Sequence, residues 1–174
     1  MPPLTSKTET ILRMWTVRDY HQMAAAGILQ PEEAVELISG QVISTMTPQG
    51  APHSSAIRRT RRLLEKALGE QGLVQTQLPI QLGDYSEPEP DIAVVRPEAN
   101  DYAEHHPTAA DIYLIIEVAD STLKTDRELK ARDYARAGIG DYWVLDVNHR
   151  QLYLFRGPTS EGYQHEIVLL SRWL

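Results

Sequence analysis

The chain contains no cysteine, which excludes disulfide bridges and thiolate metal sites and is compatible with a reducing compartment. It also lacks any apolar run that approaches the roughly 20 residues of a membrane-spanning helix. The first ten residues, MPPLTSKTET, carry charges and have no apolar core of signal-peptide length. We therefore expect a cytoplasmic protein that does not enter a membrane.

Positive charge is scarce as well. Lysine and arginine number 17 against 24 aspartates and glutamates, so the net charge is -7. This balance argues against a protein that coats nucleic acid by bulk attraction. The exception is a predicted helix from His53 to about Leu68, where Glu65 is the only acid within a basic stretch. The basic residues are Arg58, Arg59, Arg61, Arg62 and Lys66. They fit either a solvated helix face or contacts to phosphate groups.

With 42% hydrophobic residues, the chain suits a single domain over residues 1–174 with a substantial core. Thr16 to Ala26 has the pattern of a capped helix, and Ser39-Gly40 separates two apolar runs as the turn of a hairpin. Strands are then predicted at residues 74–82, 92–95, 112–118, 142–147, 151–155 and 165–170, with a helix over 124–137 and a turn over 157–162. The helix makes its two flanking strands a parallel pair. We expect an α/β fold in which helices flank a mixed sheet, with an N-terminal helix and hairpin.

Two carboxylates mark the centre of this pattern. Asp91 follows Pro90 and directly precedes the β-branched strand 92–95, and Glu117 lies near the end of strand 112–118. If the two strands pair antiparallel, the start of the first lies beside the end of the second, so Asp91 and Glu117 meet. Two buried carboxylates repel each other and lose solvation, and a divalent cation resolves that conflict.

The predicted helix 124–137 adds a third group to this pair. Lys130 and Tyr134 are four residues apart, so both side chains lie on one helical face. That face can be directed toward the carboxylates, since the helix begins shortly after the strand that carries Glu117. The sequence thus predicts an ammonium group and a phenol near the two acids.

Several segments in the same order resemble a known family. They are VELISGQV, PHSSA, PDIAVV, EVADSTLKTDRELKARDYARAGI and DYWVLD. Together, over roughly residues 17–155, they are similar to the Uma-type putative restriction endonucleases of the PD-(D/E)XK nuclease superfamily. The resemblance implies a restriction-endonuclease-like fold, DNA as substrate, and Mg²⁺ or Mn²⁺ held by Asp91 and Glu117 with the carbonyl of Val118. It also implies hydrolysis of a phosphodiester bond at that metal.

One position departs from the superfamily motif. A lysine is expected two residues after the glutamate, and Ala119 stands there. In Uma-type sequences the lysine has moved to the helix, which corresponds to Lys130, with Lys124 as the second candidate. Ala119 and the overall acidity also fit a different class of protein, a non-catalytic nuclease-like module that binds nucleic acid or protein.

Two further residues belong to the resemblance. Glu36 lies inside the first hairpin strand and is either an outward-facing residue or an additional carboxylate of the site. His53 is either a cap or surface residue at the start of its helix or a group that contacts substrate. Tyr142 and Trp143 fit either core packing or a homodimer interface.

Overall fold

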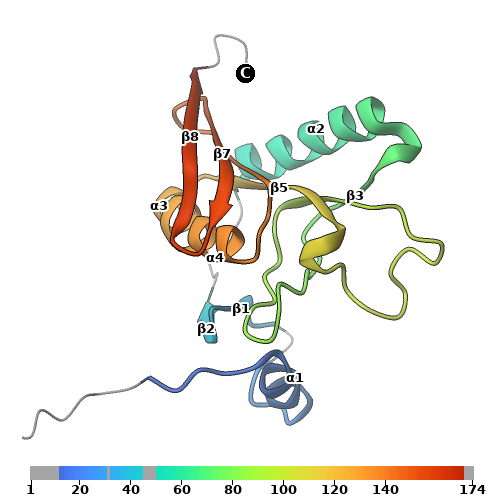
Figure 1. The fold of residues 1–174 in the computed structure, drawn as a ribbon, viewed down its shortest axis with the longest axis vertical. Coiled ribbons are helices and arrows are strands. Elements are labelled where there is room, and N and C mark those ends of the chain that lie inside the picture. The colour runs from blue at the N-terminus through green and yellow to red at the C-terminus, as the bar shows by residue number, and fades with distance from the viewer. Residues whose placement is uncertain (1–11, 31, 45–49, 171–174) are drawn as a thin grey trace, which may run out of the picture.

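The β-branched run at Ile92–Val95 forms β4, which lies next to the longest apolar run of the chain, β5 (Ile112–Ala119). Both are inner strands of a six-stranded sheet in the order β3-β4-β5-β6-β7-β8. The remaining strands are β3 (Leu73–Gln75), β6 (Asp141–Asp146), β7 (Gln151–Thr159) and β8 (Gly162–Leu170). The computed structural model of the chain describes residues 12–30, 32–44 and 50–170 (Figure 1).

Strand directions follow the sequence pattern. β5 and β6 are parallel, and every other neighbouring pair in the sheet is antiparallel. The connection between β5 and β6 is helical from Leu123 to Arg136, in three parts: α3 (Leu123–Thr125), the π-helical segment η3 (Asp126–Lys130) and α4 (Ala131–Arg136). The predicted helix and the mixed sheet are therefore confirmed, with a π-helical turn inside the helix that no periodicity indicated.

The N-terminal part contains the predicted helix and hairpin. Helix α1 (Val17–Ala25) begins at a capping box, in which Thr16 Oγ1 accepts from the Asp19 amide and Asp19 accepts from the Thr16 amide. Strands β1 (Val35–Ile38) and β2 (Gln41–Ser44) are joined by Ser39 and Gly40, both with positive φ, as a two-residue hairpin turn requires. In Figure 1 this hairpin lies between α1 and the rest of the molecule.

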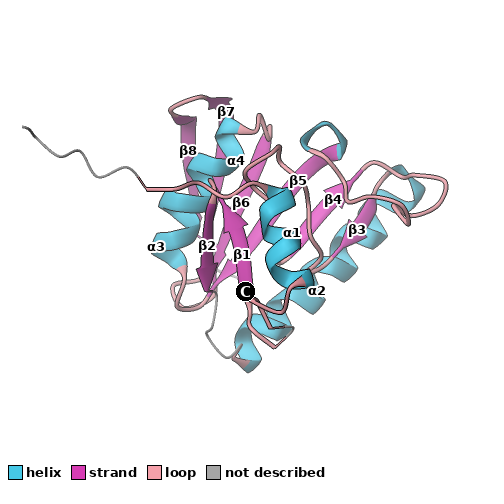
Figure 2. Cartoon of the chain, turned by 90° about the horizontal axis from the view of Figure 1, so that it is seen from below, coloured by secondary structure: helices cyan, strands magenta, loops and turns pink. Residues whose placement is uncertain are grey.

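Helices cover both faces of the sheet (Figure 2). Helix α2 (Ala51–Leu68), followed by the short helix η1 (Gly69–Gln71), packs against β3 and β5 with Ile57 buried among the apolar residues of that face. On the other face α4 packs on β7 and β8, with Tyr134 and Ala131 in the larger apolar cluster. No helix in the described part of the chain is long and apolar enough to span a membrane.

Two predicted boundaries are wrong. The strand expected over residues 74–82 ends at Gln75, because Gln77 takes a positive φ of 52° and Pro79 has no amide hydrogen to donate to a neighbouring strand. Gln81 keeps only an isolated bridge, to Thr108 before the short helix η2 (Ala109–Asp111). The turn expected over residues 157–162 is shorter, since β7 and β8 continue to the pair Thr159–Gly162.

Candidate active site

Strand pairing brings Asp91 and Glu117 together. Ile92 pairs with Ile116, so the residue before the first and the residue after the second are neighbours. The Asp91 amide donates to Glu117 Oε2 at 3.3 Å, and the Val118 amide donates to Asp91 Oδ2 at 2.8 Å. Each carboxylate is thereby fixed by backbone from the other strand.

The two helical residues point to the same carboxylate. Lys130 Nζ lies 3.0 Å from Glu117 Oε1, and the Tyr134 hydroxyl donates to that oxygen at 2.7 Å. Both side chains are buried. Lys124, by contrast, is exposed on α3. Of the two lysines that the sequence nominated, the structure brings only Lys130 into contact with the acids.

Glu36 joins this cluster from the hairpin. It is 6% exposed, and its Oε2 lies 3.2 Å from Lys130 Nζ, so the interpretation as an outward-facing strand residue is wrong. The reason is that β1 lies against the segment around Glu87, whose amide donates to the Leu37 carbonyl, and this directs Glu36 inward. Its Oε2 is buried and has no partner with hydrogen-bond geometry despite the nearby ammonium group.

His53 also lies at the site, because α2 begins at Ala51 and its first turn reaches Asp91. The His53 side chain is buried, with Nε2 3.1 Å from Asp91 Oδ2, so the cap or surface interpretation is wrong. The hydrogen bond to Asp91 raises the pKa of His53, although burial opposes it. An imidazole held in this way fixes the orientation of the Asp91 carboxylate.

Sequence reasoning missed Asp126, in the π-helical segment. It is 3% exposed, its Oδ2 accepts from Thr122 Oγ1 at 2.6 Å, and its carbonyl accepts from the Tyr142 hydroxyl at 2.9 Å. Burial raises the pKa of Asp126 to about 6, against the opposing effect of Lys130. A partial signal was available, since Asp126 precedes Lys130 by four residues and so lies on the same helical face, but its burial depends on how the segment docks on the sheet.

Negative charge exceeds positive charge in this cluster. Burial is the largest cause that raises the pKa of Glu117 to about 8, and the acids Asp91 and Asp126 act in the same direction. Lys130 opposes that shift. Burial disfavours the charged form of Lys130, yet the neighbouring carboxylates of Glu117 and Glu36 outweigh burial and raise the pKa of the ammonium. The lysine therefore stays protonated, and the cluster has room for a further cation.

These side chains line a cavity of about 640 Å³. Its wall includes every carboxylate of the cluster together with two acids nearer its rim, Glu89 and Asp120. Burial, followed by the charge of Glu36, raises the pKa of Glu89. The remaining polar lining comes from Ser44, from Gln77 and from the segment 120–126 that follows β5.

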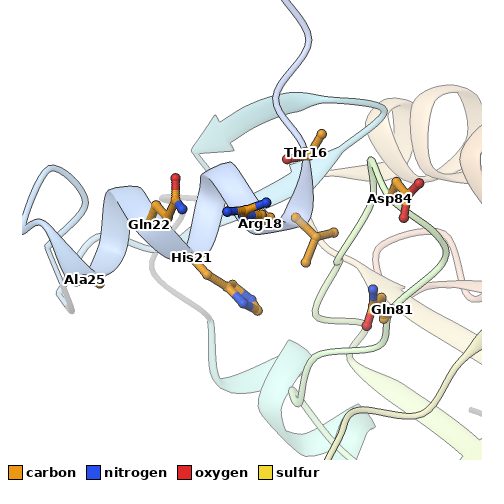
Figure 3. Close-up of a pocket in the computed structure, with 8 residues that line it drawn as sticks. Thr16, Arg18, His21, Gln22, Ala25, Gln81 and Asp84 are labelled. Atoms are coloured by element: carbon orange, nitrogen blue, oxygen red, sulfur yellow. The ribbon is translucent and has the colours of Figure 1, made fainter.

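A second cavity of about 670 Å³ lies beside α1 (Figure 3). Its polar lining includes Arg18, His21, Gln22, Gln81 and Asp84. The side chain of His21 is 56% exposed, and its Nε2 lies 2.7 Å from Glu87 Oε1. The two cavities are similar in size, but only the first is walled by several buried charges. The buried charged side chains in its wall, and not its volume, identify the first cavity as the candidate site.

The donor set fits Mg²⁺ or Mn²⁺. Within the described ranges no group of three or more histidine, aspartate or glutamate side chains is arranged to hold a metal ion. Mg²⁺ commonly binds through one or two carboxylates and completes its shell with water and substrate phosphate, so Asp91 and Glu117 suffice for such a site. The excess of acids over basic groups on the cavity wall suits a divalent cation.

Comparison with known proteins gives the same architecture and a family. A crystal structure described as "a putative nuclease belonging to DUF820 from Anabaena variabilis ATCC 29413" matches with a TM-score of 0.69 and 20% identity, over 90% of this chain and 84% of that one. At this identity the likeness shows the fold alone. No curated protein matches the chain. The Uma2 family model, described as "Putative restriction endonuclease", matches residues 17–173. The chain therefore belongs to the Uma2 family.

Proposed function

We propose that this protein is a metal-dependent endonuclease that hydrolyses phosphodiester bonds in DNA. The observation that carries the proposal is the meeting of Asp91, Glu117 and Lys130 in one buried cluster on a cavity wall. The matching family and the similar crystal structure are both described as nucleases, and this supports the same chemistry.

In this proposal Asp91 and Glu117 hold Mg²⁺ or Mn²⁺. The all-oxygen donor set favours these ions over Zn²⁺. A bound ion of this kind makes a coordinated water more acidic and neutralises charge on the phosphate. His53 keeps the Asp91 carboxylate in place through its 3.1 Å contact, and Tyr134 does the same for Glu117.

Lys130 then acts through the fixed positive charge of its ammonium group and not as a general base. Its ammonium is buried between Glu117 and Glu36, and the raised pKa keeps it protonated at neutral pH. A fixed cation in a poorly solvated site stabilises negative charge that develops on the phosphate oxygens in the transition state. Glu36 also positions this ammonium through its 3.2 Å contact.

Cleavage assays test the proposal. The wild-type chain should cut plasmid DNA with Mg²⁺ or Mn²⁺ and not with EDTA, and Asp91→Asn or Glu117→Gln should reduce the rate by roughly 100-fold or more. Asp133→Asn is the matched control, because Asp133 is also a buried acid, lies on α4 and accepts hydrogen bonds from Ser39 and Ser86 away from the cavity. Equal rates for wild type and both site variants would reject the site.

The second candidate is a non-catalytic module that binds nucleic acid or protein. The observation in its favour is Ala119, which is 1% exposed and packs into the apolar cluster at the superfamily's lysine position. Metal titration separates the two candidates, since a nuclease has to bind Mg²⁺ or Mn²⁺ through Asp91 and Glu117. Failure of the wild-type chain to cut single- or double-stranded DNA with either ion would favour the module.

The proposal also includes a cytoplasmic location and a homodimer. Tyr142 is fully buried and stacks on Phe155 and Tyr163, so it belongs to the core and not to an interface. Trp143 is partly buried against the opposite apolar cluster. A homodimer would therefore form through residues other than Tyr142, and light scattering on the purified chain measures the number of copies.

A further inference from the structure

Helix α2 carries a concentrated basic surface on the side that faces away from the sheet. Its buried side includes Ile57, with Leu64 packed against the same cluster. The five basic residues of the helix are exposed, and they make up nearly a third of the 17 in the chain. They are Arg58, Arg59, Arg61, Arg62 and Lys66. We call this set the α2 basic face.

Most of this face has no acidic partner among the described residues. In the part of the chain that the structure describes, its one ion pair joins Arg61 to Glu65 at 2.7 Å. Elsewhere several arginines are satisfied by neighbouring side chains or backbone. Examples are Arg96 with Asp111, Arg127 with Glu166, Arg156 with Asp141, and Arg136 with the Ser160 carbonyl. What distinguishes α2 is that four basic residues without an acidic partner among the described residues lie on a single helix.

The α2 basic face weakens the helix that carries it. Arg58 and Arg62 are four residues apart, as are Arg62 and Lys66, and like charges at that spacing destabilise a helix by roughly 0.2–0.5 kcal/mol a pair. Stability therefore gives no reason for the arrangement. A polyanion that binds the row would remove the repulsion.

The position of the helix relates this face to the candidate active site. Gly50 and His53, at the start of α2, line the acidic cavity. At 1.5 Å per residue the helix advances about 20 Å from His53 to Lys66. One strand of a DNA duplex carries a phosphate about every 3.4 Å along the axis, so this length corresponds to roughly six nucleotides. Arg58, Arg62 and Lys66 recur about every 6 Å along it.

We propose that the α2 basic face binds the phosphate backbone of duplex DNA next to the site of cleavage. The inference rests on the proposed function for the identity of the ligand. Contacts of this kind position the duplex without reading its sequence. The negative charge over the rest of the chain repels DNA and so directs the duplex to this surface.

Salt-dependent binding tests the proposal without any need for cleavage. Fluorescence anisotropy with a labelled 20-base-pair duplex in EDTA gives the slope of log K against log salt. The variant is Arg58→Ala with Arg62→Ala and Lys66→Ala. The control is Arg96→Ala with Arg136→Ala and Arg156→Ala, which removes the same charge elsewhere. The α2 variant should lower the magnitude of the slope by about 0.9 for each lost phosphate contact, and the control should keep the wild-type slope.

Alanine favours helix, so circular dichroism should show α2 intact in the variant. Equal slopes for wild type and the α2 variant would overturn the proposal that the α2 basic face binds DNA. The same decrease of the slope in the control variant would also overturn it. Preference of the wild-type chain for anionic vesicles over duplex DNA would also overturn it. If the α2 variant has a smaller salt slope but the wild-type chain cuts no DNA, the proposed nuclease function is rejected and DNA binding by the α2 basic face is kept. If the wild-type chain cuts DNA but the α2 variant keeps the wild-type slope, the nuclease function is kept and DNA binding by the α2 basic face is rejected.

Discussion

The two faces of strand β5 use equally buried residues for different purposes. Toward α2, Ile116 and Val118 pack with Ile92 and Val94 in a wholly apolar cluster. Toward α4, Glu117 lies between apolar neighbours and contacts an ammonium and a phenol. All the residues from Ile115 to Ala119 are 3% exposed or less. Burial alone thus does not distinguish the side that stabilises the fold from the side that carries the charges.

The charged face of β5 contributes less to stability than an apolar face of the same size would. Burying an isoleucine or valine contributes about 1.5–3 kcal/mol, whereas a buried ion pair often gains nothing over an apolar pair of the same size. A sheet that needed only to fold could have used the apolar solution on both faces. We infer that the charged face is retained for chemistry.

The largest expected effect is that of Lys130→Ala on the charged face. Cleavage should fall by roughly 100-fold or more, because a fixed cation is lost from the transition state. Stability should also fall, by about 3 kcal/mol, since Glu36 and Glu117 are left buried without their cation. Single-turnover cleavage and thermal unfolding measure the two effects. Lys124→Ala, at an exposed lysine, is the control, and cleavage by Lys130→Ala at the wild-type rate would contradict the role.

On the apolar face, Ile116→Ala should do the opposite. The cavity left by the side chain should cost about 2–5 kcal/mol of unfolding free energy. The cleavage rate of the folded protein should stay within a few-fold of wild type, since the Ile116 side chain lies in the apolar cluster on the opposite face of the sheet from Glu117. Urea unfolding and cleavage at low temperature check this. A variant that stays as stable as wild type but no longer cleaves DNA would invalidate the contrast between the faces.

Much of the central pair could be predicted from the sequence, because it depends on local patterns. The apolar runs define β4 and β5, and their antiparallel pairing places Asp91 beside Glu117. The four-residue spacing of Lys130 and Tyr134 predicts that they share a face. Since all of these elements lie within 44 residues of one another, few other arrangements compete.

The rest depends on packing between distant segments. Glu36 contacts Lys130 across 94 positions, and only the docking of the hairpin decides that it points inward. His53 reaches Asp91 because α2 starts two residues before it, beside the end of the sheet. Asp126 lies in a stretch of alternating charges, DRELK, which in most helices is solvated. Its burial follows from the docking of the π-helical segment on the sheet.

A smaller effect concerns pH in the absence of metal. The folded state raises the pKa of Glu117 from 4.5 to about 8 and that of Asp126 from 3.8 to about 6. The stability that depends on the protonated form of these two carboxyls is fully present below their pKa values in the unfolded state. It is lost as the pH rises through their pKa values in the folded state. The melting temperature in EDTA should therefore fall by about 5 °C or more between pH 5 and pH 8.5. A constant or rising melting temperature over this range would show that the acids are fully compensated.

The central claim is that the charged face of β5 exists to hold a metal and not to stabilise the fold. Thermal unfolding of wild type and Glu117→Gln at pH 8, with EDTA and with Mn²⁺, tests it most directly. In the variant Glu36 still pairs with Lys130, and Asp91 and Asp126 remain in the cluster. Glu117→Gln should therefore melt at least as high as wild type in EDTA, and Mn²⁺ should raise the melting temperature of wild type alone. A variant that melts lower in EDTA and still gains stability from Mn²⁺ would contradict the account.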